Sequence, residues 1–213
     1  PFITGRFRPG PFWPLLLSVM LAVAVGGAAW LLGAMVGVHI LLGAFVYMVI
    51  YTVWLKRRSW LNIVIGGLAG SFAVLAGAAV VDPGIHPAAG ALAVVLFLWT
   101  PSHFWSLAIA RHEDYRAAGV PMLPVVAGDR VTAWAILLNT AVLVAVSVVP
   151  ALYGLGWVYF ASAALGGAYL LAVNIRLVAA PHDRKVARAS FHASLVQLTA
   201  LLAGALVDVH LIA

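Results

Sequence analysis

The sequence has few charged residues for its length. Asp, Glu, Lys and Arg make up 8% of the 213 residues, whereas hydrophobic residues make up 65%. A soluble domain carries about 25% charged residues, so the composition excludes an ordinary soluble fold. The net charge of +6 does not indicate nucleic-acid binding, because the cations are few and lie in apolar context. In a membrane protein, a basic excess sets orientation and contacts anionic headgroups.

Cysteine is also absent, and so is a recognisable signal peptide. Without cysteine, these residues have no disulfide and no thiolate metal site. The opening stretch, PFITGRFRPGPF, has no cleavage pattern after its apolar part and does not begin with Met. We therefore expect the sequence to begin inside a longer protein.

Long uncharged runs predict an all-α integral membrane protein. Between Arg8 and Lys56 there are 47 residues without Asp, Glu, Lys or Arg. A bilayer core about 30 Å thick needs about 20 helical residues, so this run holds two crossings. Such runs must be helical, because an open strand edge is not tolerated in lipid. Seven helices are expected, over 12–33, 36–54, 61–81, 88–110, 131–152, 156–177 and 187–207.

All Lys and Arg residues fall on one side of a seven-helix arrangement. They occupy the amino-terminal stretch and the second, fourth and sixth connections. The turns near 34, 82–87 and 153–156 contain none. The positive-inside rule places the basic side in the cytoplasm. The cations are Arg6, Arg8, Lys56, Arg57, Arg58, Arg111, Arg116, Arg130, Arg176, Arg184, Lys185 and Arg188.

Two basic-side segments are candidates for chemistry. The loop 111–130 is 20 residues long and contains Glu113 and Asp114, and a loop of that length is usually functional or disordered. The Lys56–Arg58 cluster is either a headgroup anchor or a site for diphosphate or carboxylate. Asn62, one turn further on, adds a neutral donor to that site.

His103 lies a little over two turns inside a predicted membrane helix, where a histidine seldom faces lipid. It is either bonded to a neighbouring helix or placed for a haem contact or proton transfer.

Three segments carry a resemblance to a known family. They are YTVWLKRRSWLNIVIGGLAG at 51–70, LFLWTPSHFWSLAI at 96–109 and EDYRAAGVPMLPVVAGDR at 113–130. Together they resemble the protoheme IX farnesyltransferases, or haem O synthases, among the UbiA-type intramembrane prenyltransferases. PFITGR at 1–6 and the stretch 187–208 are similar to further parts of the family, so the likeness covers nearly the whole chain in order.

The resemblance implies one transmembrane prenyltransferase domain over 1–213, with seven helices of a nine-helix bundle. It also implies transfer of a farnesyl group from farnesyl diphosphate to a vinyl group of haem b, with Mg²⁺ as cofactor. The product would be haem O, for haem–copper oxidase assembly in the bacterial plasma membrane, and haem A synthase is an implied partner.

Site roles carry over by position. Asp114 and Tyr115 match the family's second polar motif, with Asp114 as a Mg²⁺ ligand. The Lys56–Arg58 cluster matches the basic motif that contacts diphosphate or propionates. The substrate-binding positions implied are Asn62, His103, Arg111 and Arg116.

The sequence departs from the family in three places. The first Asp-rich motif is missing, which implies that two helices and the main Mg²⁺ carboxylates precede Pro1. We accordingly expect residues 1–213 alone to be inactive with haem and prenyl diphosphate. Ser102 replaces a proline in the TP-x-HFW motif. The stretch 70–81 lacks the usual two prolines and tryptophan, so the cavity wall there is expected to differ.

Two alternatives remain open. A UbiA-type enzyme acting on an aromatic quinone precursor would usually show D-x-x-x-D at the second motif, but Ala110 occupies its first acidic position. The second alternative is a protein that is not an enzyme, namely a membrane transporter or a haem-handling scaffold. A transporter usually shows broken helix pairs or midplane charges, and neither is evident here.

Overall fold

The seven predicted membrane segments are present as helices. The structure, a computed structural model, describes residues 10–212, so Arg6, Arg8 and the stretch 1–6 lie outside the described residues. Six helices are long and apolar enough to cross a membrane. They are α1 (Phe12–Leu31), α2 with its π-helical continuation η1 (Ala34–Phe45, Val46–Leu55), α5 (Pro87–Ala110), α8 with the 3₁₀ turn η2 (Asp129–Ser147, Val149–Tyr153), α9 (Trp157–Ala179) and α10 (Arg184–Ile212).

The third predicted segment is shorter and interrupted. Residues 62–78 form α3 (Asn62–Gly66) and α4 (Leu68–Ala78), which meet at Gly67. A Cβ added at Gly67 would lie 3.1 Å from the Thr100 side chain on α5, so the glycine permits a close approach of the two helices. None of the described residues forms a β-strand, and the chain is an all-α integral membrane protein.

The connection 111–130 is ordered and contains two short helices. These are α6 (His112–Ala117) and α7 (Leu123–Ala127), and α7 begins just before Pro124. Gly119 and Gly128 both adopt positive φ, which is readily available to glycine. The segment treated as a long loop in the sequence therefore contains regular structure.

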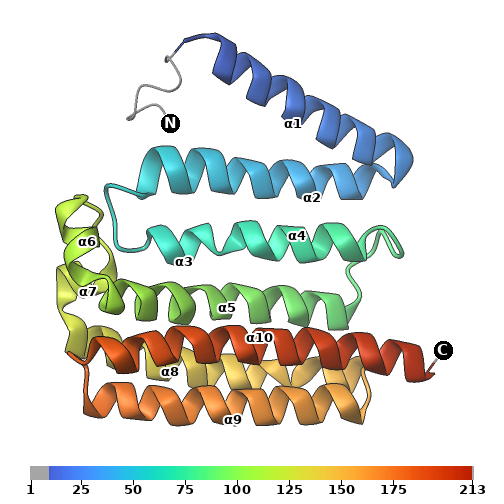
Figure 1. The fold of residues 1–213 in the computed structure, drawn as a ribbon. Helices are drawn as coiled ribbons and strands as arrows, with labels where there is room; N and C mark the ends of the chain where they lie inside the picture. Colours follow the sequence, from blue (N-terminus) through green and yellow to red (C-terminus); the bar gives the residue numbers. More distant parts are fainter. Residues whose placement is uncertain (1–9, 213) are drawn as a thin grey trace.

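Four helices form the core of the bundle. α5 and α9 each pack on both α8 and α10. α4 packs on α5, α2 lies on α4, and α1 packs on α2 (Figure 1). The side chains within the four-helix part are partly polar. Thr140 accepts a hydrogen bond from Asn174 (Nδ2 to Oγ1, 2.9 Å) and contacts Ser102 (3.0 Å between hydroxyl oxygens), and Asn174 accepts one from Ser190.

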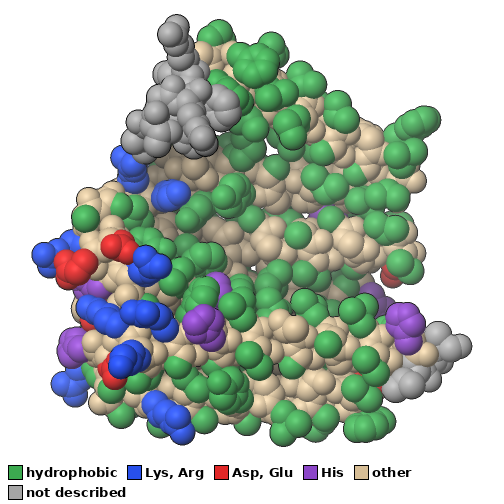
Figure 2. Space-filling view, viewed as in Figure 1, with side chains coloured by type: hydrophobic (Ala, Val, Ile, Leu, Met, Phe, Trp, Pro, Cys, Tyr) green, Lys and Arg blue, Asp and Glu red, His purple; other side chains and the backbone are tan. Residues whose placement is uncertain are grey.

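The charged residues gather at one end. The turn after η1, the α5–α8 connection and the α9–α10 turn all lie at the same end of the bundle (Figure 1). In the space-filling view, the Lys and Arg side chains on the visible face cluster at that end, while hydrophobic side chains cover the rest (Figure 2). The predicted one-sided distribution therefore holds for the cations that the structure describes.

Candidate functional site

A cavity opens beside α6 at the basic end. It has a volume of about 370 Å³ and is lined by Arg111, Asp114 and Tyr115 together with Leu107, Ala118 and Val120. The polar residues come from the end of α5 and from α6, whereas Leu107 lies one turn deeper in α5. The site therefore combines an apolar wall with charged groups at its mouth. Three sequence-predicted residues come together here.

The charges at this cavity are exposed. The Arg111 Nη1 atom lies 3.1 Å from Asp114 Oδ2, and both side chains are about two-thirds exposed (67% and 68%). An exposed pair of this kind contributes little stability, so both groups are free to exchange partners. Arg116 pairs with Glu113 (Nε to Oε2, 3.5 Å) and does not line this cavity.

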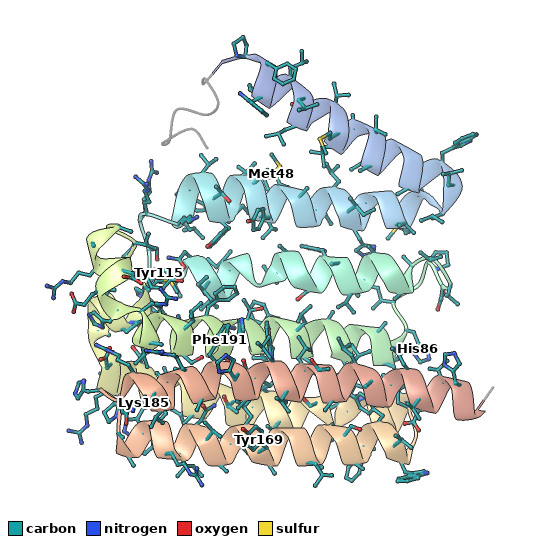
Figure 3. All side chains as sticks on the ribbon, viewed as in Figure 1. Met48, His86, Tyr115, Tyr169, Lys185 and Phe191 are labelled. Atoms are coloured by element: carbon teal, nitrogen blue, oxygen red, sulfur yellow. The ribbon has the colours of Figure 1, made fainter. Side chains whose placement is uncertain are left out.

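Tyr115 is half-buried and fixes α6 on the bundle. Its ring packs against the hydrophobic core cluster that contains Ile63, Trp105 and Met122, and Figure 3 shows it at the basic end. Burial raises the pKa of its phenol above the ordinary value, and Asp114 raises it further while Arg111 opposes the shift. The phenol is therefore protonated at neutral pH and can donate a hydrogen bond.

The Lys56–Arg58 cluster forms the turn between η1 and α3, and its three side chains are exposed. Lys56 Nζ lies 5.8 Å from the ring centroid of Tyr51, within the range of a cation–π contact. Tyr51 also packs against the core cluster that Tyr115 contacts. The cluster and α6 are thus attached to the same part of the core.

Asn62 is buried instead of facing the mouth. It is 1% exposed, and its Nδ2 donates to the Lys56 carbonyl at 3.4 Å. Its Oδ1 is buried without a hydrogen-bond partner among the described residues. Asn62 therefore stabilises the Lys56–Arg58 turn through its Nδ2, while its Oδ1 remains available to accept a hydrogen bond.

His103 lies between α5 and α10, away from the cavity. Its Nδ1 is 2.8 Å from the Ser194 hydroxyl. Its ring stacks between Trp99 and Phe191, with centroid distances of 4.1 and 4.4 Å. Eight residues separate it from Arg111, about 12 Å along a helix. Of the two interpretations of His103, the bond to a neighbouring helix is observed.

Asp129 is a buried carboxylate near the mouth that sequence patterns did not single out. Asp129, the first residue of α8, is 5% exposed. It accepts hydrogen bonds from His112 (2.8 Å) and Arg184 (2.8 Å), and His182 lies at 3.3 Å. From sequence, Asp129 was only one of several basic-side acids. Its position directly after a glycine, two residues before the helix predicted at 131–152, was the one available signal.

Comparison with known proteins identifies the family. The profile described as "UbiA prenyltransferase family" matches residues 1–195. A relative named "Protoheme IX farnesyltransferase 2" from Paramagnetospirillum magneticum is 54% identical over 208 residues, covering 98% of this chain and 72% of the relative.

Further relatives agree. "Protoheme IX farnesyltransferase 1" of the same organism is 51% identical, covering 99% of this chain and 74% of the relative. "Protoheme IX farnesyltransferase" of Gloeobacter violaceus is 48% identical, covering 76% of this chain and 53% of the relative. No solved structure matches the chain. With the family profile covering most of its length, this membrane-embedded chain is a prenyltransferase and belongs to the UbiA prenyltransferase family.

Proposed function

We propose that the protein transfers the farnesyl group of farnesyl diphosphate to a vinyl group of haem b, producing haem O for haem–copper oxidase assembly. The observation that carries the proposal is the cavity lined by Arg111, Asp114 and Tyr115. Its apolar wall suits an isoprenoid chain, and its charged mouth suits a diphosphate. The names of the similar proteins support the choice of haem as acceptor.

The chemistry follows from the charges. The C–O bond to the diphosphate breaks, and the diphosphate leaves with the electron pair. The allylic cation is attacked by the vinyl π electrons, and the new cation is captured by water, which then loses a proton. Arg111 and the Lys56–Arg58 cluster stabilise the charge on the leaving diphosphate. The protonated Tyr115 phenol donates a hydrogen bond to it, and the apolar wall limits early capture by water.

Mg²⁺ is the proposed cofactor, with Asp114 as a ligand. Within residues 10–212, no group of three or more His, Asp and Glu side chains is placed to hold a metal alone. Mg²⁺ commonly takes one or two carboxylates plus substrate phosphates, and Asp114 offers one exposed carboxylate at the cavity. When bound, the ion would neutralise charge on the diphosphate.

The remaining substrate-binding roles are narrower. Arg116 lies on α6 outside the cavity lining, so we assign it to the approach of anionic substrate. Asn62 contributes its unpartnered Oδ1 or supports the basic turn. His103 already uses Nδ1 toward Ser194, so a haem contact would involve its other ring nitrogen, Nε2.

We further propose that the basic end faces the cytoplasm of a bacterial plasma membrane and that haem A synthase receives the product. The cations at one end support this orientation. Lys185, an exposed residue at that end, offers a test. A cysteine introduced there should react with an impermeant maleimide in inverted vesicles and not in right-side-out vesicles.

The decisive experiment incubates the full-length protein that contains these residues, in membranes, with haem b and farnesyl diphosphate, followed by mass analysis of the extracted haem. Residues 1–213 alone are expected to show no turnover. We expect a gain of one farnesyl group plus one water. Asp114→Asn should lower the rate at least about 100-fold, as for loss of a group that stabilises transition-state charge. The control Asp82→Asn alters an exposed acid at the opposite end and should leave the rate unchanged.

The same assay separates the alternatives. Prenylation of an aromatic quinone precursor, with haem unchanged, would favour the other UbiA-type activity. Haem recovered without added mass from an otherwise folded protein would favour a non-enzymatic role. Arg111→Gln should raise the KM for farnesyl diphosphate, whereas the control Arg176→Gln, at the same end on α9, should not.

A further inference from the structure

Asp129 joins three separate segments at the basic end. Its Oδ1 accepts from His112 at the start of α6, and its Oδ2 accepts from Arg184 at the start of α10. The same Arg184 Nη1 donates to the Ile109 carbonyl at 2.6 Å, near the end of α5. One buried carboxylate thus connects the α5–α6 junction, α8 and α10.

The location of Asp129 makes these bonds strong. Its side chain is only 4% exposed, so solvent screens the contacts weakly. It begins α8, where the helix dipole favours a negative charge. By contrast, the ion pairs within α6 are exposed on both sides and hold the segment weakly.

α6 needs such a tie, because it is short and carries the mouth residues. It has six residues, none of them fully buried, and a helix of that length is not stable by itself. Two attachments fix it to the rest of the bundle, the packing of Tyr115 on the core and the bond from His112 to Asp129, beside its contacts with the neighbouring α5 and α7. Asp114 lies between these two points, so both attachments determine where its carboxylate is held.

We propose that Asp129 is a positioning residue, which through His112 and Arg184 holds α6 so that Asp114 and Tyr115 face the cavity. Asp129 does not line the cavity and acts on the substrate only through these partners. Its effect on turnover rests on the proposed function, whereas its effect on the geometry of α6 does not.

The geometric test uses paired spin labels. These 213 residues contain no cysteine, so cysteines can be introduced at Ala117 on α6 and Ala189 on α10, both exposed. We expect a narrow distance distribution by pulsed electron paramagnetic resonance in lipid nanodiscs. Asp129→Asn should broaden it, and Asp129→Glu should restore most of the narrow component.

The matched control is Tyr159→Phe. The Tyr159 hydroxyl donates to the Ser147 carbonyl at 2.7 Å near the other end of the bundle, so the variant removes a buried hydrogen bond without touching the mouth. It should destabilise the protein while leaving the label distances unchanged. A distribution that is the same in Asp129→Asn as in the wild type, or that Tyr159→Phe broadens equally, would overturn the proposal.

The kinetic test uses the unlabelled full-length protein that contains these residues. Asp129→Asn should lower kcat/KM for farnesyl diphosphate about tenfold or more and raise the Mg²⁺ concentration needed for half-maximal rate, with little change in KM for haem. Tyr159→Phe should remain within about twofold of the wild type. Equal loss in both variants, or broadened distances with unchanged kinetics, would refute the positioning role. Absence of haem prenylation by the full-length wild type would refute the proposed function, and the spin-label distances would still decide the geometry.

Discussion

Replacing Asp208 should strongly destabilise the bundle, although the residue lies far from the basic end. Asp208 is 2% exposed, and its Oδ2 accepts a hydrogen bond from the Tyr159 backbone N–H at 2.6 Å. Tyr159 is the third residue of α9, so a carboxylate from α10 satisfies a free donor in the first turn of another helix. Gly156 permits this contact, because a Cβ there would lie 2.9 Å from Asp208 Oδ1.

The size of the effect follows from these contacts. A hydrogen bond to a charged group contributes about 1.5–3 kcal/mol, and a negative charge at a helix N-terminus adds about 0.3–1 kcal/mol. We therefore expect Asp208→Ala to lower the free energy of unfolding by about 3 kcal/mol. Asp208→Asn keeps an acceptor oxygen and should cost about 1 kcal/mol.

Asp82 provides the matched control, since it is an acid in an exposed turn at the same end. Within residues 10–212, its Oδ1 accepts only the local Gly84 N–H, so Asp82→Ala should cost less than about 0.5 kcal/mol. The measurement is unfolding in mixed micelles, followed by circular dichroism. Equal losses in the Asp208 and Asp82 variants would refute the assignment of Asp208 as an interhelical cap.

Three further predictions concern packing, polar contacts and titration. Gly204→Ala should destabilise the protein by about 1–3 kcal/mol, because its Cβ would lie 2.6 Å from Ser162 Oγ. The control Gly77→Ala has nothing within 4 Å of the added Cβ, so its melting temperature should be unchanged or higher. Asn174→Leu removes the buried side chain that donates to Thr140 and accepts from Ser190. It should lower the free energy of unfolding by about 2 kcal/mol or more, and an unchanged free energy of unfolding would contradict a stabilising role for these bonds. For Tyr115, burial raises the folded-state pKa, so a difference spectrum against Tyr115→Phe should show a phenol that ionises above pH 10. The stability that the neutral Tyr115 phenol contributes should be fully present below the pKa of this tyrosine in the unfolded chain, and it should be lost as the pH rises through its pKa in the folded protein.

The sequence alone was sufficient for the membrane architecture. Uncharged runs long enough to cross a bilayer have one low-energy solution, which is a helix, and charges mark where each run ends. This is why the segments predicted at 88–110 and 156–177 match α5 and α9 within a few residues. The family motifs also located the second polar segment, and Asp114 and Tyr115 do share a cavity.

Only the tertiary structure decided which polar residues are partnered and with whom. Periodicity does not reveal that His103 stacks on Phe191, because that contact joins α5 to a helix about 90 residues later. Nor does it separate buried Asp208 from exposed Asp82. The π-helical stretch Val46–Leu55 is likewise not evident from the composition of the uncharged run.

Asp129 shows the physical reason most clearly. Its charge and its place at a helix start were readable, but its donors lie 17, 53 and 55 residues away in the chain. Solvation by lipid determines the helices one at a time, through local composition. The pairing of buried polar groups depends on how the helices pack together, and that packing is what brings His112 and Arg184 to one carboxylate at the basic end of the bundle.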